Sequence, residues 1–380
     1  MADGTSIEWT QRPGTKGASW NPVRARNRAT GKVGWHCTHD SEGCRFCYAE
    51  GFNLRLGTGL AYKPGHERDI EVFLDQKTLQ DPLRWKTPRT IFCGSMTDLF
   101  AAFVSDAQLD DIFAIAALSP HHTFIFLTKR ASRLRAYMAN VEREAFWMNA
   151  VARRLDATPE LMKVCHPILD RRAPWLPLPN VWLGVSAEDQ ASADKRVPDL
   201  LATPAGVRFV SAEPLLGPIN LESKLGGTRW VGGQRGCDGR HQHAGAAGEI
   251  IHGILHNADP RQLHHHHDDR CQRGLDWVIV GGESGRHARP MHPAWARDIG
   301  RQCFINRVSF FFKQWGAWAP TMAPGADGPT HWYFPNGSIR QIKNAEIWPL
   351  DGAPIAKLGK KAAGRLLDGV EHSDFPKVSA

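Results

Sequence analysis

The sequence lacks a hydrophobic run long enough to cross a membrane, because no stretch of eighteen residues is apolar throughout. Its first ten residues, M-A-D-G-T-S-I-E-W-T, also lack the basic and apolar regions of a signal peptide. We therefore expect a cytoplasmic protein with no membrane association.

Cysteine is also scarce, with eight in 380 residues. So few cysteines in so long a chain do not predict a disulfide framework, and we expect free or metal-bound thiols in a reducing compartment. Cys93, Cys165 and Cys303 lie in apolar segments and are expected in the core.

No compact run of lysine and arginine marks a docking patch, although the net charge is +8 and the pI is about 9.1. This charge favours an anionic partner such as nucleic acid or a nucleotide. Hydrophobic residues make up 42% and charged residues 23%, which is typical of a globular protein. The length allows one barrel-sized domain with additions, or two ordinary domains.

One short loop concentrates the metal-binding chemistry. Residues 36–49 read H-C-T-H-D-S-E-G-C-R-F-C-Y-A, with Cys37, Cys44 and Cys47 inside eleven residues and Gly43 to allow a tight turn. Three thiolates suit a soft metal or an iron–sulfur cluster, whereas a closed zinc site needs a fourth ligand, and none follows at a short spacing. Ordinary buried thiols are the alternative.

Downstream, short β-rich apolar runs end in polar clusters, and helix-forming segments follow most of them. Helices are expected near 48–56, 106–118, 190–201 and 293–305, and Ser105 and Gln108 are placed as a capping box. The polar clusters are Ser95, Thr97 and Asp98; Thr128, Lys129 and Arg130; Ser186, Glu188 and Asp189; Ser211 and Glu213; Glu283 and Ser284; Lys313 and Gln314.

Apolar strands that alternate with helices predict a parallel sheet covered by helices. Functional side chains of a βα barrel come from the carboxyl ends of its strands, where these clusters lie. With a short strand around Trp35 ahead of the cysteine loop, the strands number seven. We therefore predict an α/β fold with a partial or distorted TIM-like (β/α) barrel, and a doubly wound open sheet is the alternative. Some polar residues, such as Ser105 and Asp189, are expected only to cap helices.

A cysteine loop ahead of barrel-like repeats resembles the radical S-adenosylmethionine (SAM) superfamily. In that superfamily three cysteines after the first strand hold a [4Fe-4S] cluster, and SAM chelates the open iron. Phe46, directly before Cys47, matches the superfamily's aromatic residue, whereas six residues separate Cys37 from Cys44 where three are usual. The resemblance implies that the cluster, fed by an electron donor, cleaves SAM to a 5′-deoxyadenosyl radical.

The chain as a whole is still more similar to an uncharacterised phage and prophage protein family of unknown function. The similarity covers residues 6–318. Its motifs are S-W-N-P, S-E-G-C-R-F-C-Y-A-E, G-S-M-T-D-L-F, L-T-K-R, F-V-S-A-E-P-L-L-G-P, D-W-V-I-V-G-G-E-S-G and F-F-F-K-Q-W-G.

The radical SAM resemblance also implies roles for the strand-end residues. Ser95 and Asp98 take the place of the G-G-E that contacts the SAM amino group, Ser186 and Glu188 suit the ribose hydroxyls, and Glu213 joins them as cofactor-binding. Lys129, Glu283 and Lys313 are then left for substrate binding or proton transfer. An ion pair between Lys129 and Glu283 is the alternative.

A second Cys/His cluster interrupts the barrel between residues 229 and 274. Cys237 with His241 or His243, and His266 or His267 with Cys271, have spacings that suit tetrahedral zinc. This segment is poor in apolar residues, so a bound metal would supply its stability. A weak, adventitious metal-binding tract is the alternative for the histidine run. The barrel is thus assigned to 1–320 and a C-terminal extension to 321–380, with a short basic helix at K-K-A-A-G-R-L-L-D-G.

Three functions follow. The first is a radical SAM-type enzyme that modifies or repairs a nucleobase of DNA or RNA. The second is a zinc-dependent nucleic-acid-binding protein without catalysis. The third is a hydrolase or nuclease with Asp98, Glu188, Glu213 and Glu283 around a hard divalent metal, which leaves the cysteine loop unexplained.

Overall fold

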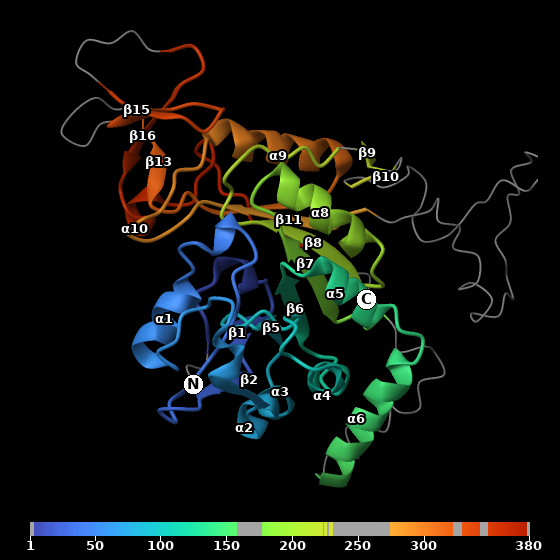
Figure 1. Cartoon of the computed structure of the whole chain (residues 1–380). Coiled ribbons are helices and arrows are strands. Elements are labelled where there is room, and N and C mark those ends of the chain that lie inside the picture. Colours follow the sequence, from blue (N-terminus) through green and yellow to red (C-terminus); the bar gives the residue numbers. More distant parts are fainter. Residues whose placement is uncertain are drawn as a thin grey trace, which may run out of the picture.

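A seven-stranded parallel sheet forms the centre of the molecule (Figure 1). The computed structural model describes residues 4–157, 177–222, 224–225, 228–230, 274–321, 329–342 and 349–377. The strands, in order across the sheet, are β1 (Lys16–Trp20), β5 (Arg89–Cys93), β6 (Thr123–Thr128), β7 (Val181–Ser186), β8 (Val207–Ala212), β11 (Trp277–Gly281) and β12 (Ser309–Gln314). Each neighbouring pair is parallel.

The strand order follows the chain order without a reversal, and the sheet curls into a half-barrel. A doubly wound sheet would reverse its strand order at an internal switch point, so that alternative does not describe this protein. The predicted α/β class is confirmed, and six of the seven predicted strands belong to this sheet, which, over the described residues, is open and does not close into a full barrel.

Helices follow the strands, as parallel crossovers require. They are α4 (Asp106–Ala117), α5 (Ala131–Met138), α8 (Gln190–Leu201) and α9 (Pro293–Asn306), and α6 (Arg143–Ala157) packs against α4. Ser105 forms the expected capping box at the start of α4. Asp189 caps α8, as expected, and it does so through a capping box. The predicted helix 48–56 is α1 (Tyr48–Leu56), which ends at Gly57.

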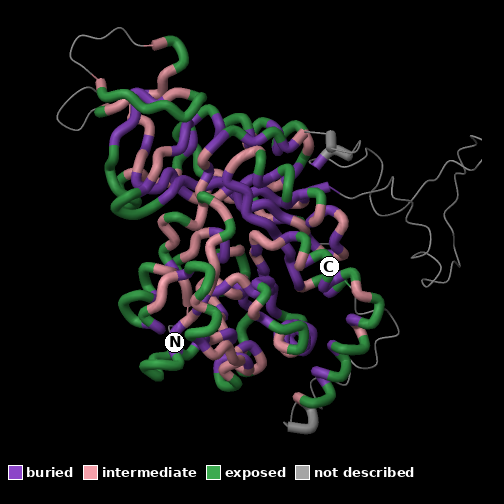
Figure 2. Tube along the Cα trace, viewed as in Figure 1, coloured by how far each residue is buried: buried purple, intermediate pink, exposed green. Residues whose placement is uncertain are grey.

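The strands of the central sheet are largely buried (Figure 2), and two separate clusters of side chains pack against them. One set packs between the sheet and its helices, including Phe126, Val185 and Val280. The other set covers the opposite face of the sheet. Its members include Phe92, Ile125, Trp182, Phe209, Trp277, Ile279 and Phe311. Trp9 and Phe375, from opposite ends of the chain, close this second cluster, with ring centroids 4.7 Å from Phe92 and 5.5 Å from Trp277 respectively.

The first strand of the large sheet is not the one expected. The short strand near Trp35 is β3 (Val33–Gly34), which pairs with β2 (Val23–Asn27), and β2 pairs with β4 (Ile70–Leu74) in a separate antiparallel sheet. The large sheet starts at β1, whose K-G-A-S-W sequence has too few β-branched residues to mark a strand. The short elements α2 (Gln76–Leu79), α3 (Asp81–Arg84), η1 (Glu8–Thr10), η2 (Glu42–Cys44) and η3 (His66–Arg68) complete this half.

The C-terminal extension contains a four-stranded antiparallel sheet that the sequence did not predict. Its strands are β13 (Trp318–Pro320), β14 (His331–Tyr333), β15 (Ile339–Gln341) and β16 (Ala353–Lys357). The expected short basic helix is α10 (Lys360–Ala363). No helix in the described ranges is long and apolar enough to span a membrane.

Several predicted residues lie outside the described ranges. After β9 (Lys224–Leu225) and β10 (Thr228–Arg229), residues 231–273 are not described, and these include all the candidate zinc ligands: Cys237, His241, His243, His266, His267 and Cys271. Cys165 also lies outside. Cys93 and Cys303 are buried, as expected of core residues.

The packing of the sheet's inner face can be tested at Gly184. A Cβ atom at this position would overlap the ring of Phe209 on the neighbouring strand. We expect Gly184→Ala to lower the free energy of unfolding by about 1–3 kcal/mol, because overpacking forces neighbouring side chains from their rotamers. Urea unfolding followed by circular dichroism measures this difference.

Gly51→Ala is the matched control, because a Cβ atom at Gly51 in α1 meets nothing within 4 Å. The control should stabilise the protein by about 0.5–1 kcal/mol through helix propensity. Equal destabilisation by both variants would contradict the packing described for Phe209.

Candidate functional site

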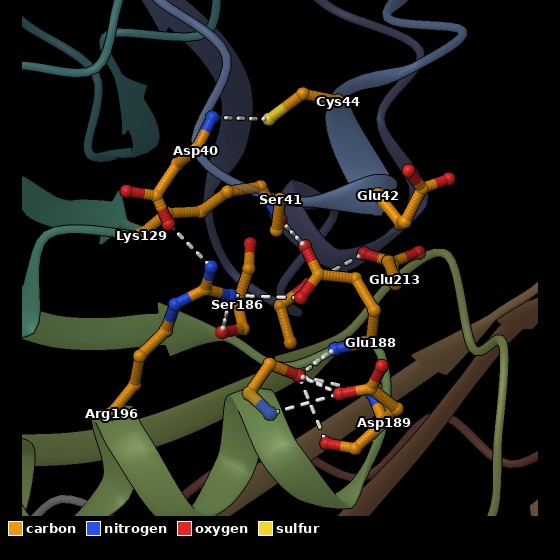
Figure 3. Close-up of polar contacts among 12 residues, drawn as sticks. Asp40, Ser41, Glu42, Cys44, Lys129, Ser186, Glu188, Asp189, Arg196 and Glu213 are labelled. Atoms are coloured by element: carbon orange, nitrogen blue, oxygen red, sulfur yellow. Dashed lines mark hydrogen bonds and ion pairs between the residues drawn. The ribbon is translucent and has the colours of Figure 1, made fainter.

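The cysteine loop lies over the carboxyl ends of the central strands (Figure 3). Ser41 donates a hydrogen bond from its hydroxyl to Glu188 Oε1 at 2.6 Å, and Arg196 of α8 reaches Asp40 at 2.6 Å. Gly43 is required here by close approach, since a Cβ atom would collide with the Glu188 carboxylate. The loop is thereby fixed against β7 and α8.

The three predicted ligands are half-buried thiols without a disulfide. Burial raises the pKa of Cys37 to about 12, the charge of Asp98 adds to this rise, and Arg130 opposes it. Burial also raises the pKa of Cys47, and the charge of Cys44 adds to it. Cys47 in turn raises the pKa of Cys37, so the thiols lie within electrostatic range of one another. Cys37 and Cys47 therefore stay protonated at neutral pH unless a bound metal compensates their charge.

The donor set suits a cluster better than a single ion. No three His, Cys, Asp or Glu side chains of the described residues already surround a point where one metal ion would bind. Three soft thiols from one loop are nevertheless the ligand type of an iron–sulfur cluster, whose several irons spread their ligands more widely. By ligand type, Cys37, Cys44 and Cys47 are thus the residues of the loop that could hold such a cluster.

Glu188 is the most connected predicted residue of the site. Its side chain is 2% exposed, and it pairs with Lys129 and, at 2.8 Å, with Arg196. Burial would raise the pKa of Glu188, but the charges of Lys129 and Arg196 outweigh it and lower this pKa to about 2. Lys129 therefore pairs with Glu188, and the alternative pair with Glu283 is not formed.

Asp98 holds a second contact to the loop. Its oxygens accept hydrogen bonds from the Thr128 hydroxyl at 2.7 Å, the Lys129 amide at 3.0 Å and the Arg130 guanidinium at 2.7 Å. The same guanidinium donates to the carbonyl and hydroxyl oxygens of Thr38, next to Cys37. Asp98 thus orients Arg130 toward the thiols.

Ser95 and Ser186 flank these contacts. Ser95 accepts a hydrogen bond at its hydroxyl from Asn21 at 3.0 Å, and its carbonyl accepts one from the Tyr48 hydroxyl at 2.7 Å. Ser186 is buried, and its carbonyl accepts from Arg196 at 2.9 Å.

The remaining predicted residues form two pairs at the ends of β8, β11 and β12. Lys313 lies 3.1 Å from Glu213, which also accepts a hydrogen bond from the Ser211 hydroxyl at 2.9 Å. Glu283 binds the guanidinium of Arg289 through both oxygens, at 2.7 and 2.9 Å. Arg289 continues to the Glu42 carbonyl at 2.9 Å and lies over the ring of Phe46, so Glu283 also supports the cysteine loop.

The sequence analysis missed the residues that join the loop to the barrel: Asp40, Ser41, Arg196 and Arg289, and the orientation of Arg130. Asp40 and Arg196 are 156 positions apart, and no local pattern reports such a contact. The only available signal was the charge of residues near the strand ends.

The comparisons with known proteins bear on this geometry. A family model described as "Protein of unknown function (DUF5131)" matches residues 4–376. The chain belongs to this family. That identity confirms the expected membership of an uncharacterised family, and it carries no link to phages or to the radical SAM superfamily. No curated protein and no solved structure matches the chain.

The Glu188 ion pairs predict a pH-dependent loss of stability in Glu188→Gln. At pH 7 the variant leaves Lys129 and Arg196 without their buried partner, at a cost of about 3–5 kcal/mol. The Glu188 pKa is depressed to about 2, so its contribution is present above the unfolded pKa near 4.3 and is lost as pH falls toward 2. The difference between wild type and variant should therefore shrink below about pH 4 in urea unfolding.

Glu71→Gln provides the control, because Glu71 forms an ion pair with Arg26 in which both side chains are about half exposed. We expect it to change the unfolding free energy by less than about 1 kcal/mol. A Glu188→Gln effect as small as this, or one independent of pH, would contradict the assigned role.

Proposed function

We propose that this protein is a radical SAM-type iron–sulfur enzyme built on a partial TIM-like barrel. The observation that carries the proposal is the position of three thiols in one loop, fixed over the carboxyl edge of a parallel half-barrel by Glu188, Asp98 and Glu283. Enzymes with βα barrels place their chemistry at this edge.

Cys37, Cys44 and Cys47 would hold a [4Fe-4S] cluster, and SAM would complete its coordination. The chemistry that such a cluster would supply, once reduced by an electron donor, is a one-electron cleavage of the C5′–S bond of SAM to methionine and a hydrogen-abstracting radical. The protein's part is to orient the bound groups and to exclude water.

The site residues would divide this work by position. Ser95 and Ser186 suit direct contacts to SAM, whereas Asp98 and Glu188 act through the loop that they hold, because their oxygens are engaged by protein donors. Glu213 and Lys313 lie 3.1 Å apart at the ends of β8 and β12. This pair suits substrate binding or proton transfer. Lys129 and Glu283 position Glu188 and Arg289 respectively.

The ion pairs disfavour the hydrolase alternative. Asp98, Glu188, Glu213 and Glu283 each pair with a cationic side chain, namely Arg130, Lys129 with Arg196, Lys313, and Arg289. A hard divalent metal needs several carboxylate oxygens directed to one point, and these carboxylates are directed to separate cations. A nuclease mechanism would have to break each pair first.

The substrate proposed is a nucleobase of DNA or RNA. The net charge of +8 favours an anionic partner, and a base in a duplex would have to be flipped out to reach the barrel edge. A reducing cytoplasm suits both the free thiols and an oxygen-sensitive cluster.

Metal analysis of protein purified without oxygen tests the proposal. Wild type should contain about four irons per chain with matching sulfide, and should release 5′-deoxyadenosine from SAM in the presence of dithionite. Cys44→Ala should lose most of the iron and all of this product, because one cluster ligand is removed. Iron and sulfide assays with chromatography of the product measure both.

Cys303→Ala is the matched control, because Cys303 is a buried thiol of α9 outside the loop. It should keep wild-type iron content and product formation. Zinc without iron in the wild type would overturn the enzyme reading in favour of the zinc-dependent binding protein. Unchanged SAM cleavage in Cys44→Ala would also overturn it.

A further inference from the structure

A small cationic cavity adjoins the cysteine loop on the side of α5 and α8. Its volume is about 310 Å³. Five cationic side chains and two acidic ones line it: Lys129, Arg130, Arg133, Lys195 and Arg196, with Asp40 and Asp199. Guanidinium and ammonium groups gathered around one cavity favour an anionic ligand.

Four of the five cations already have partners. Lys129 and Arg196 pair with Glu188, Arg196 also pairs with Asp40, Arg130 pairs with Asp98, and Arg133 pairs with Asp106. Asp199 pairs with Arg135. Lys195 is exposed and forms no ion pair within the described ranges. Its ammonium group is therefore available to a ligand.

Two further features of the cavity lining bear on a ligand. Arg196 is 2% exposed, yet its Nε–H group has no hydrogen-bond partner among the described residues. Leaving a buried donor of this kind unsatisfied is costly. The first turn of α5 also has no side-chain cap, because Arg130 occupies the N-cap position, and Ser132 in this turn is exposed. Uncapped amide groups at a helix start favour an anion.

We infer that this cavity binds a phosphate group of the substrate, carried either by a free nucleotide or by a nucleic-acid strand. Arginine forks, an ammonium group and helix amides together match the several oxygens of a phosphate. The inference rests on the proposed function, since Lys129 and Arg196 join the cavity to Glu188 and thus to the cysteine loop. A phosphate here would place the attached nucleoside at the barrel edge.

Binding of a fluorescein-labelled single-stranded DNA oligonucleotide, followed by anisotropy at several salt concentrations, tests this assignment. Lys195→Ala should weaken binding severalfold for every base sequence and lower the salt slope by about one, as loss of one phosphate contact requires. Lys86→Ala is the control, because Lys86 is an exposed lysine just before β5. It therefore lies toward the amino ends of the strands, away from the carboxyl edge. It should leave the affinity within about twofold of wild type.

Ser132→Asp is a second variant that does not depend on Lys195. A carboxylate in the first turn of α5 suits the helix dipole, so the melting temperature should not fall, while the added charge should abolish phosphate binding. Competition by a deoxynucleoside monophosphate separates the two sources. Strong competition identifies a free nucleotide, and its absence identifies a strand.

Equal effects of Lys195→Ala and Lys86→Ala, or tight binding by Ser132→Asp, would overturn the phosphate site. Failure of the proposed function is seen separately, because iron content and SAM cleavage are measured without any oligonucleotide. Oligonucleotide binding that depends on Lys195 in a protein without iron would leave the phosphate site intact and remove the radical mechanism.

Discussion

The buried carboxylate of Glu188 is the contact on which the arrangement of the site depends. It joins three parts of the chain: the cysteine loop through Ser41, the end of β6 through Lys129 and the helix α8 through Arg196. A buried ion pair of this kind often contributes less to stability than well-packed apolar residues would, because both charges lose their hydration. Its value here is positional, since movement of either cation would cost Glu188 one of its two ionic partners.

The same logic repeats along the edge of the half-barrel. Asp98 directs Arg130 to Thr38, and Glu283 directs Arg289 to the Glu42 carbonyl, so three carboxylates at strand ends each support the loop through an arginine or a lysine. Below them, Phe209, Trp182 and Trp277 fill the sheet's inner face. The apolar layer fixes the strands, and the strands fix the carboxylates, so the precision of the loop derives from packing well away from it.

The elements that the sequence predicted are those specified by local pattern. The runs from Thr123 and from Val181 are apolar and β-rich, and Ser105 with Gln108 marks the start of α4, so their positions follow from neighbouring residues alone. β1 was not predicted because its hydrogen bonds to β5, rather than its own composition, make it a strand. The C-terminal sheet was not predicted because its strands β13, β14 and β15 have only three residues each, too few to show an alternating pattern.

For the site, the residue types were predictable but their partners were not. The sequence pattern placed Lys129, Glu188 and Glu283 at the carboxyl edge of the sheet, yet which cation each carboxylate binds depends on the curl of the sheet.

These ion pairs matter for the chemistry of the cysteine loop. Because every one of these carboxylates already pairs with a cation, the Cys37 thiol can ionise only if new positive charge arrives or if existing cations shift toward it. The guanidinium of Arg130 already lowers the pKa of Cys37, while Asp98, its own partner, raises that pKa. A cation bound by the thiols would reverse these two effects at Cys37, since it would be attracted by Asp98 and repelled by Arg130. Metal binding and the Asp98–Arg130 pair would therefore be coupled through the side chain of Cys37.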